Sequence, residues 1–195
     1  HKVDVYEKED KVGGQIHLAA VPPRKDEILR SLDYYNHILP GLGVNIHLNA
    51  EASVEEMNAA DAVIVAIGAH DFALPVPGAD GANVVSSWDV LNGTAEAKGR
   101  CVVIGGGLVG TETAEYLLKK GCTVTIVEMM DDLITTPGIC LANTSFLRDF
   151  FEANNVPVHL ETKLCEILED GVLVKDKNGM QYKINADSTI LSIGY

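Results

Sequence analysis

Residues 100–128 read RCVVIGGGLVGTETAEYLLKKGCTVTIVE, and this stretch carries the clearest structural signal in the chain. The apolar run at 100–104 predicts a buried strand, and three glycines in a short turn follow it directly. The pattern over 109–120 predicts a helix, which Gly121 ends in the position that favours glycine after a helix. A second apolar run at 123–127 predicts another strand. Strand, helix and strand in this order are typical of a parallel α/β sheet.

The three glycines have a spacing that suits a dinucleotide. Gly105, Gly107 and Gly110 form a G-x-G-x-x-G pattern between the predicted strand and helix. The first glycine permits a tight turn, the second lets the backbone approach a pyrophosphate, and the third lets the helix pack closely on the strand. The helix start, with Leu108 and Val109 in its first turn, offers backbone N–H groups and a positive dipole end to phosphates. The sequence therefore predicts a dinucleotide site here.

An acidic residue ends the second predicted strand. Glu128 lies 18 residues after Gly110. A carboxylate in this position accepts hydrogen bonds from ribose hydroxyls and repels a 2′-phosphate. Met129 and Met130 follow it and supply no positive charge. The sequence therefore favours NAD(H) over NADP(H).

The N-terminal part of the chain has a similar pattern. Alternating residues at 2–7 predict a strand that ends in an acid, and residues 25–39 predict a helix stopped by Pro40-Gly41. The apolar run at 61–67, ended by a glycine, predicts a fully buried parallel strand. For Glu7, at the end of the first strand, two interpretations stay open: a solvated strand-end acid, or a second ribose-binding acid.

The chain's length of 195 residues allows one ordinary domain or two small ones. Pro and Gly residues at 75–83 and a polar stretch further on predict a connection, with a linker over 84–98. In the second part, Asp170-Gly171 and Asn178-Gly179 predict two tight hairpin turns. We therefore expect an α/β domain with a mostly parallel sheet and a hairpin insert over 99–195.

Composition excludes several classes of function. Lys and Arg number 15 against 28 Asp and Glu, which gives a net charge of −13, a poor basis for binding nucleic acid or an anionic membrane. No apolar run approaches the roughly 20 residues of a membrane helix. The four cysteines and six histidines show no close ligand spacing, so no metal site is predicted. Reduced thiols in a cytoplasmic protein are the expectation.

Several motifs together resemble one family. HKVDVYEKEDKVGGQ at 1–15, DAVIVAIGAH at 61–70 and ADSTILSIGY at 186–195 resemble segments of flavoproteins with two dinucleotide-binding domains. GGQIHLAAVPPRKDEILRSLDYY at 13–35 resembles the C-terminal region of NADH:flavin oxidoreductases related to 2,4-dienoyl-CoA reductase, 2-enoate reductase and trimethylamine dehydrogenase. The resemblance covers essentially the whole chain.

The resemblance implies a domain plan and cofactors. Residues 99–195 would form a Rossmann-like three-layer NAD-binding domain, and residues 1–83 a partial FAD-binding domain of Rossmann-like fold. The first strand and glycine motif of the FAD domain are expected before residue 1. In the family, a barrel with FMN and an iron–sulfur cluster precedes this region, and that barrel of the same chain is the expected partner. An oligomer stays open.

The resemblance also implies roles for further residues. Glu112 would face the nicotinamide side, and Gly194 would lie beside the dinucleotide. The implied flavin contacts are Glu7, Gly14, Gln15 and Gly68. No catalytic side chain is expected, because hydride transfer between two cofactors requires that they be positioned rather than a protein nucleophile.

The implied function is electron transfer from NADH through FAD to a partner flavin or iron–sulfur centre, as in an NADH oxidase. The piece itself is expected to be inactive in isolation. Two alternatives stay open: a pyridine nucleotide-disulfide reductase-like enzyme, and a non-enzymatic NAD-binding module. A disulfide reductase is disfavoured because no redox cysteine pair follows the first glycine turn or lies between residues 123 and 165.

Overall fold

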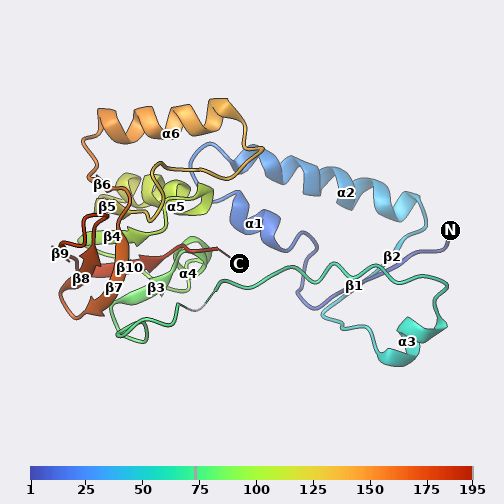
Figure 1. Ribbon diagram of the computed structural model, residues 1–195. Helices are drawn as coiled ribbons and strands as arrows, with labels where there is room; N and C mark the ends of the chain where they lie inside the picture. The colour runs from blue at the N-terminus through green and yellow to red at the C-terminus, as the bar shows by residue number, and fades with distance from the viewer. Residues whose placement is uncertain (73, 195) are drawn as a thin grey trace. The chain divides into compact units, whose positions relative to one another are not determined.

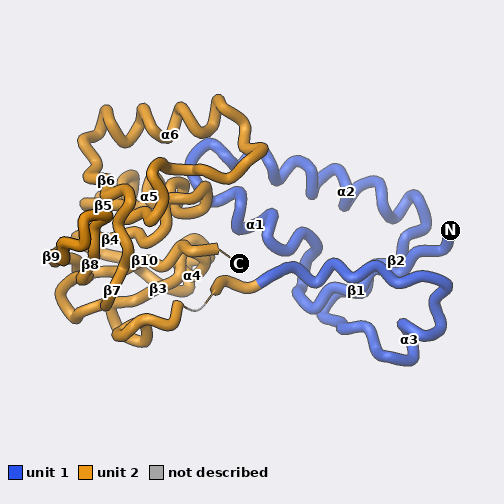
Figure 2. Tube along the Cα trace, in the orientation of Figure 1, with its two compact units in different colours: residues 1–69 blue, residues 70–195 orange. Residues whose placement is uncertain are grey.

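A computed structural model describes residues 1–72 and 74–194 and divides the chain into two compact units, 1–69 and 70–195 (Figure 2). In the described residues no helix is both long and apolar enough to cross a membrane. The boundary after residue 69 lies earlier in the chain than the predicted end of the first domain at residue 83.

The segment expected to be a linker, 84–98, has regular structure. It contains β3 (Val84–Ser86) and α4 (Ser87–Asn92). Because β3 pairs in parallel with the last strand of the chain, the segment belongs to the main sheet and does not bridge two domains.

The second unit is built on a five-stranded parallel sheet (Figure 1). Its order is β3-β10-β4-β5-β6, where the remaining strands are β4 (Arg100–Ile104), β5 (Thr123–Val127), β6 (Val158–His159) and β10 (Ser188–Leu191). Helix α5 (Leu108–Lys119) connects β4 to β5, and α6 (Leu141–Ala153) connects β5 to β6. The predicted α/β fold with a parallel sheet is confirmed.

The sheet is buried on both faces, which explains why its central strands are rich in apolar residues. Cys101 and Val103 of β4 pack in a core with α4, α5 and α6, whereas Val102 and Ile104 pack in a second core on the opposite face. Successive side chains of a strand point to opposite faces, so one strand supplies both cores. The result is a three-layer arrangement of helices, sheet and a second, antiparallel sheet.

The third layer is the three-stranded antiparallel sheet β7-β8-β9. It comprises β7 (Lys163–Leu168), β8 (Gly171–Lys175) and β9 (Gln181–Asn185). The strands are joined by a turn at Glu169-Asp170, one residue earlier than the predicted Asp170-Gly171, and by a turn over 177–179 that includes the predicted Asn178-Gly179. Val172 and Val174 of β8 are fully buried against the main sheet.

The first unit has far less regular structure. A two-stranded parallel sheet pairs β1 (Asp4–Glu7) with β2 (Asn45–Leu48). The helices are α1 (Gln15–Ala19), a 3₁₀ turn at Asp26–Ile28, α2 (Leu29–Gly41) and α3 (Val54–Ala59). Helix α2 begins four residues later than the predicted helix over 25–39, runs through Pro40 and ends at Gly41, two residues later than predicted.

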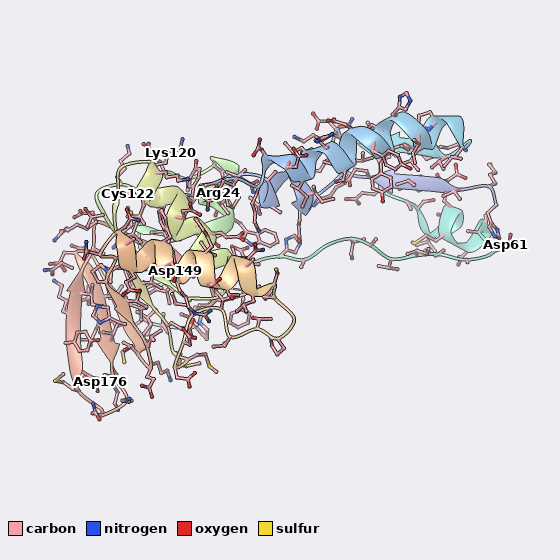
Figure 3. All side chains as sticks on the ribbon, turned by 90° about the horizontal axis from the view of Figure 1, so that it is seen from above. Arg24, Asp61, Lys120, Cys122, Asp149 and Asp176 are labelled. Atoms are coloured by element: carbon pink, nitrogen blue, oxygen red, sulfur yellow. The ribbon has the colours of Figure 1, made fainter. Side chains whose placement is uncertain are left out.

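The prediction of a buried strand at 61–67 is wrong. The segment runs on from Asp61 as an extended chain (Figure 3) and pairs with no strand among residues 1–72 and 74–194. Ile64 is 91% exposed and Ile67 is 90% exposed. An apolar run becomes a buried strand only when a neighbouring strand completes its hydrogen bonds, and β1 and β2 pair only with each other. The segment therefore presents apolar side chains to solvent.

An ion pair joins the beginnings of β4 and β10. The Asp187 carboxylate accepts hydrogen bonds from the Arg100 backbone N–H at 2.8 Å and from the guanidinium at 2.6 and 3.1 Å. The Arg100 side chain, and next its backbone N–H, lower the pKa of Asp187 from an ordinary 3.8 to about 2.

This low pKa predicts a loss of stability in acid. The unfolded chain takes up the proton near pH 3.8, whereas the folded chain resists it down to about pH 2. The stabilisation is therefore present above that window and is lost as the pH falls through it. We expect the urea midpoint to drop between these pH values, and to drop less in Asp187→Asn. The exposed Asp80→Asn is the control, and equal acid sensitivity in wild type and Asp187→Asn would contradict the assignment.

Candidate functional site

The candidate site lies at the carboxyl edge of the five-stranded sheet. From β4 the chain passes through α5 to β5 on one side, whereas β10 borders β4 on the other side. In parallel α/β sheets, ligands bind at the place where the strand order reverses in this way. The structure puts the loops that follow β4, β5 and β10 at this edge.

Two of the motif glycines are fixed by close backbone packing. Gly105 has φ +107°, and a Cβ there would lie 2.2 Å from the Ser192 carbonyl oxygen. A Cβ on Gly110 would lie 1.9 Å from the Gly105 carbonyl oxygen. Neither position can hold a side chain, so the turn, α5 and the end of β10 pack backbone against backbone.

Gly107 has the opposite environment. It caps α5 with φ −68° and ψ −176°, and a Cβ there would meet nothing within 4 Å. The Thr111 N–H donates to the Gly107 carbonyl at 2.9 Å in the first hydrogen bond of the helix. The backbone N–H groups of residues 108–110 therefore have no helical partner. Open space beside unpaired amides fits a pyrophosphate.

Glu128 lies directly beside this turn. Its carboxylate accepts hydrogen bonds from the Gly106 N–H at 2.5 Å and the Met130 N–H at 2.7 Å. A Cβ on Gly106 would lie only 3.0 and 3.2 Å from the Glu128 Cβ and Cγ, and 2.5 Å from a Leu133 methyl carbon. Gly106 thus belongs to the candidate site, although it occupies an x position of the G-x-G-x-x-G pattern. The run of three successive glycines at 105–107 was the feature of the sequence that could have indicated its importance.

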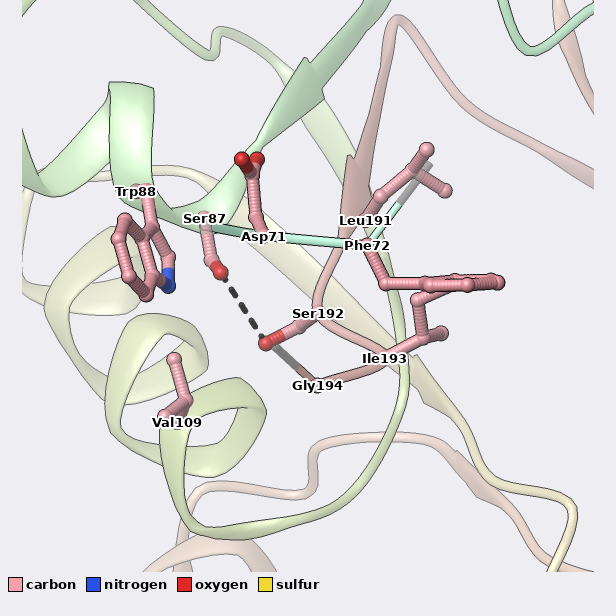
Figure 4. A pocket seen from close by; sticks show the side chains of 9 residues that line it. All are labelled: Asp71, Phe72, Ser87, Trp88, Val109, Leu191, Ser192, Ile193 and Gly194. Atoms are coloured by element: carbon pink, nitrogen blue, oxygen red, sulfur yellow. Dashed lines mark hydrogen bonds between the residues drawn. The ribbon is translucent and has the colours of Figure 1, made fainter. Parts of the chain in front are cut away.

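The remaining predicted NAD contacts lie around the same edge. Glu112 belongs to α5 and is only 9% exposed. Gly194, with φ +104°, follows β10, and its carbonyl accepts the Phe72 N–H at 3.1 Å. Val109 and Gly194 line a small pocket (Figure 4). Sequence reasoning missed other residues of that pocket, namely Phe72, Ser87, Trp88 and Ser192, because their chain segments carry no motif.

The predicted flavin contacts lie in the first unit. The Gln15 side-chain amide donates to the Ala69 carbonyl at 3.1 Å, and a Cβ on Gly68, which has φ +76°, would lie 3.4 Å from the same Gln15 nitrogen. The structure thus brings Gln15 and Gly68 together. Gly14 caps α1 with φ +43°. Glu7 ends β1, and its carboxylate accepts the Glu9 N–H at 3.0 Å.

Comparison with known proteins gives related sequences over the full chain. Bilirubin reductase of Mediterraneibacter gnavus is 38% identical over 196 residues, covering 100% of this chain and 30% of the relative. Cinnamate reductase of Clostridium sporogenes is 39% identical over 198 residues, covering 100% of this chain and 29% of the relative. The chain thus spans about 30% of the length of these curated relatives.

A solved structure shows the same fold. A 2-naphthoyl-CoA reductase, in complex with 2-naphthoyl-CoA, superposes with a TM-score of 0.89 at 26% identity, covering 100% of this chain and 29% of that chain. The family profile described as pyridine nucleotide-disulphide oxidoreductase matches residues 24–195. This chain belongs to the pyridine nucleotide-disulphide oxidoreductase family.

Proposed function

We propose that the chain is the dinucleotide-binding part of a larger NADH-dependent flavoenzyme. In this proposal residues 70–195 bind NADH, and residues 1–69 contribute part of an FAD site. The main support is the glycine turn after β4. A side chain at Gly105 or Gly110 would collide with neighbouring backbone, whereas Gly107 has open space beside it. That combination serves close approach of a ligand phosphate to backbone N–H groups.

Each part of the turn has a proposed role. The N–H groups of residues 108–110 would hold the pyrophosphate, and the Glu128 carboxylate would accept the adenosine ribose hydroxyls. Glu112 and Gly194 would lie towards the nicotinamide. Bound NADH supplies a hydride that a flavin can accept, so the residues of this chain need only bind, orient and exclude water. No protein nucleophile or general acid is required.

For the first unit, we propose that Glu7, Gly14, Gln15 and Gly68 contribute to an FAD site. The hydrogen bond from Gln15 to Ala69 supports this, because it joins two segments that are far apart in sequence but both carry predicted flavin contacts. From FAD, electrons would pass to a partner flavin or iron–sulfur centre in a barrel domain of the same longer protein. The greater length of the curated relatives supports a larger protein. We further propose that it is cytoplasmic.

The alternative function, a disulfide reductase that uses a pair of cysteines, is less well supported than electron transfer from NADH through FAD. Burial, and secondarily the neighbouring Cys122, raise the pKa of the Cys101 thiol to about 12. The thiolate is the reactive form of cysteine, so this thiol is a poor nucleophile at neutral pH. Cys140 is exposed and Cys165 half-buried, and all four cysteines are free thiols.

The contrast between two glycines predicts a matched pair of variants. Gly107→Ala adds a methyl group where nothing lies within 4 Å, so it should lower stability by at most about 1 kcal/mol. It should nevertheless weaken NADH at least about tenfold, because the methyl group occupies the space proposed for the pyrophosphate.

Gly110→Ala is the control for that variant. It forces a methyl group against the Gly105 carbonyl and should lower the unfolding free energy by about 1–3 kcal/mol. Thermal unfolding and calorimetric titration of NADH measure both quantities. Unchanged NADH affinity in a stable Gly107→Ala variant would contradict the phosphate assignment.

Cofactor preference depends on Glu128. Glu128→Ala should weaken NADH by about 1–3 kcal/mol, because hydrogen bonds to a charged acceptor are lost. The same change should narrow the gap between NADH and NADPH, because the repulsion of a 2′-phosphate is removed. Titrations of both nucleotides against wild type and variant check this. Tighter binding of NADPH than NADH by the wild type would refute the role of Glu128.

Flavin binding should be weak in this chain. Residues 1–69 are all described, and among them only Ala20, Pro22 and Leu32 are buried. A unit with so small a core holds its binding loops poorly. We expect the purified chain to be colourless and to bind added FAD weakly in a fluorescence titration. A yellow protein with one tightly held flavin per chain would show that the first unit is a complete FAD site.

A further inference from the structure

The loop between β5 and α6 holds both backbone groups of Gly106. The Gly106 N–H donates to the Glu128 carboxylate at 2.5 Å, and the Gly106 carbonyl accepts the Ile134 N–H at 2.9 Å. Leu133 packs against the same glycine, because a Cβ on Gly106 would lie 2.5 Å from a Leu133 methyl carbon. The conformation of the glycine turn is therefore tied to that of residues 128–134.

Ile134 meets the turn in a conformation that it does not favour. Its φ is +53°, in the left-handed region, which is unfavourable for a β-branched residue. The side chains of Leu133 and Ile134 are each only 4% exposed and belong to the core on the helix side of the main sheet. Such a backbone conformation persists only where surrounding contacts hold it. The loop therefore needs a restraint close to Ile134.

Arg148 of α6 supplies such a restraint. Its Nε donates to Asp132 Oδ1 at 3.0 Å, and its Nη2 lies 2.9 Å from Asp132 Oδ2. The same Nη2 donates to the Leu133 carbonyl. A planar guanidinium can serve these acceptors together, because its N–H groups form a fixed fork. Arg148 thus holds the carbonyl end of the peptide that joins Leu133 to Ile134.

Two peptide groups lie in series between Arg148 and the open side of the turn. The Leu133–Ile134 peptide has its carbonyl on Arg148 and its N–H on the Gly106 carbonyl. In a planar trans peptide the C=O and the N–H point in opposite directions. The N–H of the Gly106–Gly107 peptide is therefore directed away from Ile134. Gly107 is the motif glycine with open space beside it.

The charge at the start of this series favours an anion at its end. Hydrogen bonds in series polarise one another, because a carbonyl that accepts a hydrogen bond makes the N–H of the same peptide a stronger donor. The positive guanidinium of Arg148 therefore strengthens the Gly107 N–H as a donor. A phosphate oxygen suits such a donor, since hydrogen bonds to charged acceptors are stronger than neutral ones.

We propose that Arg148 is a positioning residue for the pyrophosphate of the dinucleotide. Through the Leu133–Ile134 peptide it orients and polarises the Gly106–Gly107 peptide, so that the Gly107 N–H joins the donors at the start of α5. Asp132 keeps the guanidinium in place. The inference rests on the proposed NAD site and adds a residue of α6 that lies outside the glycine motif.

Arg100 offers a matched control in the same unit. Its Nε and Nη2 bond both carboxylate oxygens of Asp187, at 3.1 and 2.6 Å, in the same geometry that joins Arg148 to Asp132. Arg100 lies at the beginning of β4, at the opposite end of that strand from the glycine turn. Its removal therefore tests the loss of a bidentate ion pair without disturbing the turn.

Three ligands test the proposal on the 195-residue chain. NADH and ADP-ribose both carry the pyrophosphate, whereas adenosine has no phosphate. We expect Arg148→Ala to weaken NADH and ADP-ribose by the same factor, about 3- to 10-fold, because a hydrogen bond to phosphate is weakened. Arg148→Lys keeps the charge but not the fork, so its affinities should lie between those of Arg148→Ala and the wild type. Adenosine should bind all of these proteins equally, and Arg100→Ala should change none of the affinities.

The amide signals of the free protein provide an independent readout. In a ¹H–¹⁵N NMR spectrum, an amide nitrogen responds to the hydrogen bond that the preceding carbonyl accepts. We therefore expect Arg148→Ala to shift the Ile134 and Gly107 signals and to speed hydrogen exchange of the Ile134 N–H. Arg100→Ala should leave both signals in place. Melting temperatures without ligand establish that each variant is folded during the titrations, and Arg148→Lys carries the comparison if Arg148→Ala does not fold.

The outcomes separate the two proposals. If neither NADH nor ADP-ribose binds the wild type, the proposed NAD site is wrong and the role of Arg148 with it. If both bind and the Arg148 variants keep full affinity, the NAD site stands and the role of Arg148 is overturned. Equal weakening of adenosine would also overturn it, because the loop would then act on the ribose. The same loss of affinity in Arg100→Ala would overturn it too, because the effect would then follow stability alone.

Discussion

The second unit depends on a place where three backbone segments meet without side chains. The Gly105 carbonyl lies where a Gly110 side chain would be, and the Ser192 carbonyl lies where a Gly105 side chain would be. This contact sets the distance of α5 from the sheet, and it places β10 beside β4. The open face at Gly107 and the hydroxyls of the buried Ser87 and the half-buried Ser192 lie beside this contact.

The parts of the fold that could be predicted are those with local causes. The strands at 100–104 and 123–127 are rich in apolar residues because layers cover both of their faces. The predicted hairpin turns follow from the conformational preferences of the dipeptides at Asp170 and Asn178. The spacing of the glycines predicted the turn after the first of these strands. The position of Glu128 at the end of the second strand indicated that its carboxylate lies near that turn.

The parts that were missed depend on partners distant in sequence. Residues 61–67 have a strand pattern, but a strand forms only where another strand pairs with it, and no strand in the described part of the chain does. The reverse holds for β3, whose short polar-flanked segment becomes a strand because β10 pairs with it. Gly106 escaped notice because its role depends on a carboxylate 22 residues away. The sequence pattern of one segment does not show which distant segment it pairs with.

The hydrogen bonds of Glu128 have a consequence for how cofactor preference could change. The Gly106 and Met130 N–H groups that now hold its carboxylate would both lose their acceptor if the side chain became short and neutral. Neighbouring backbone N–H groups of this kind form a natural anion-binding concavity. A single substitution would thus remove a negative charge and, at the same place, free two donors suited to a phosphate. The preference for NADH over NADPH would therefore depend mainly on the Glu128 side chain. The same two backbone N–H groups could hold either its carboxylate or the 2′-phosphate of NADPH.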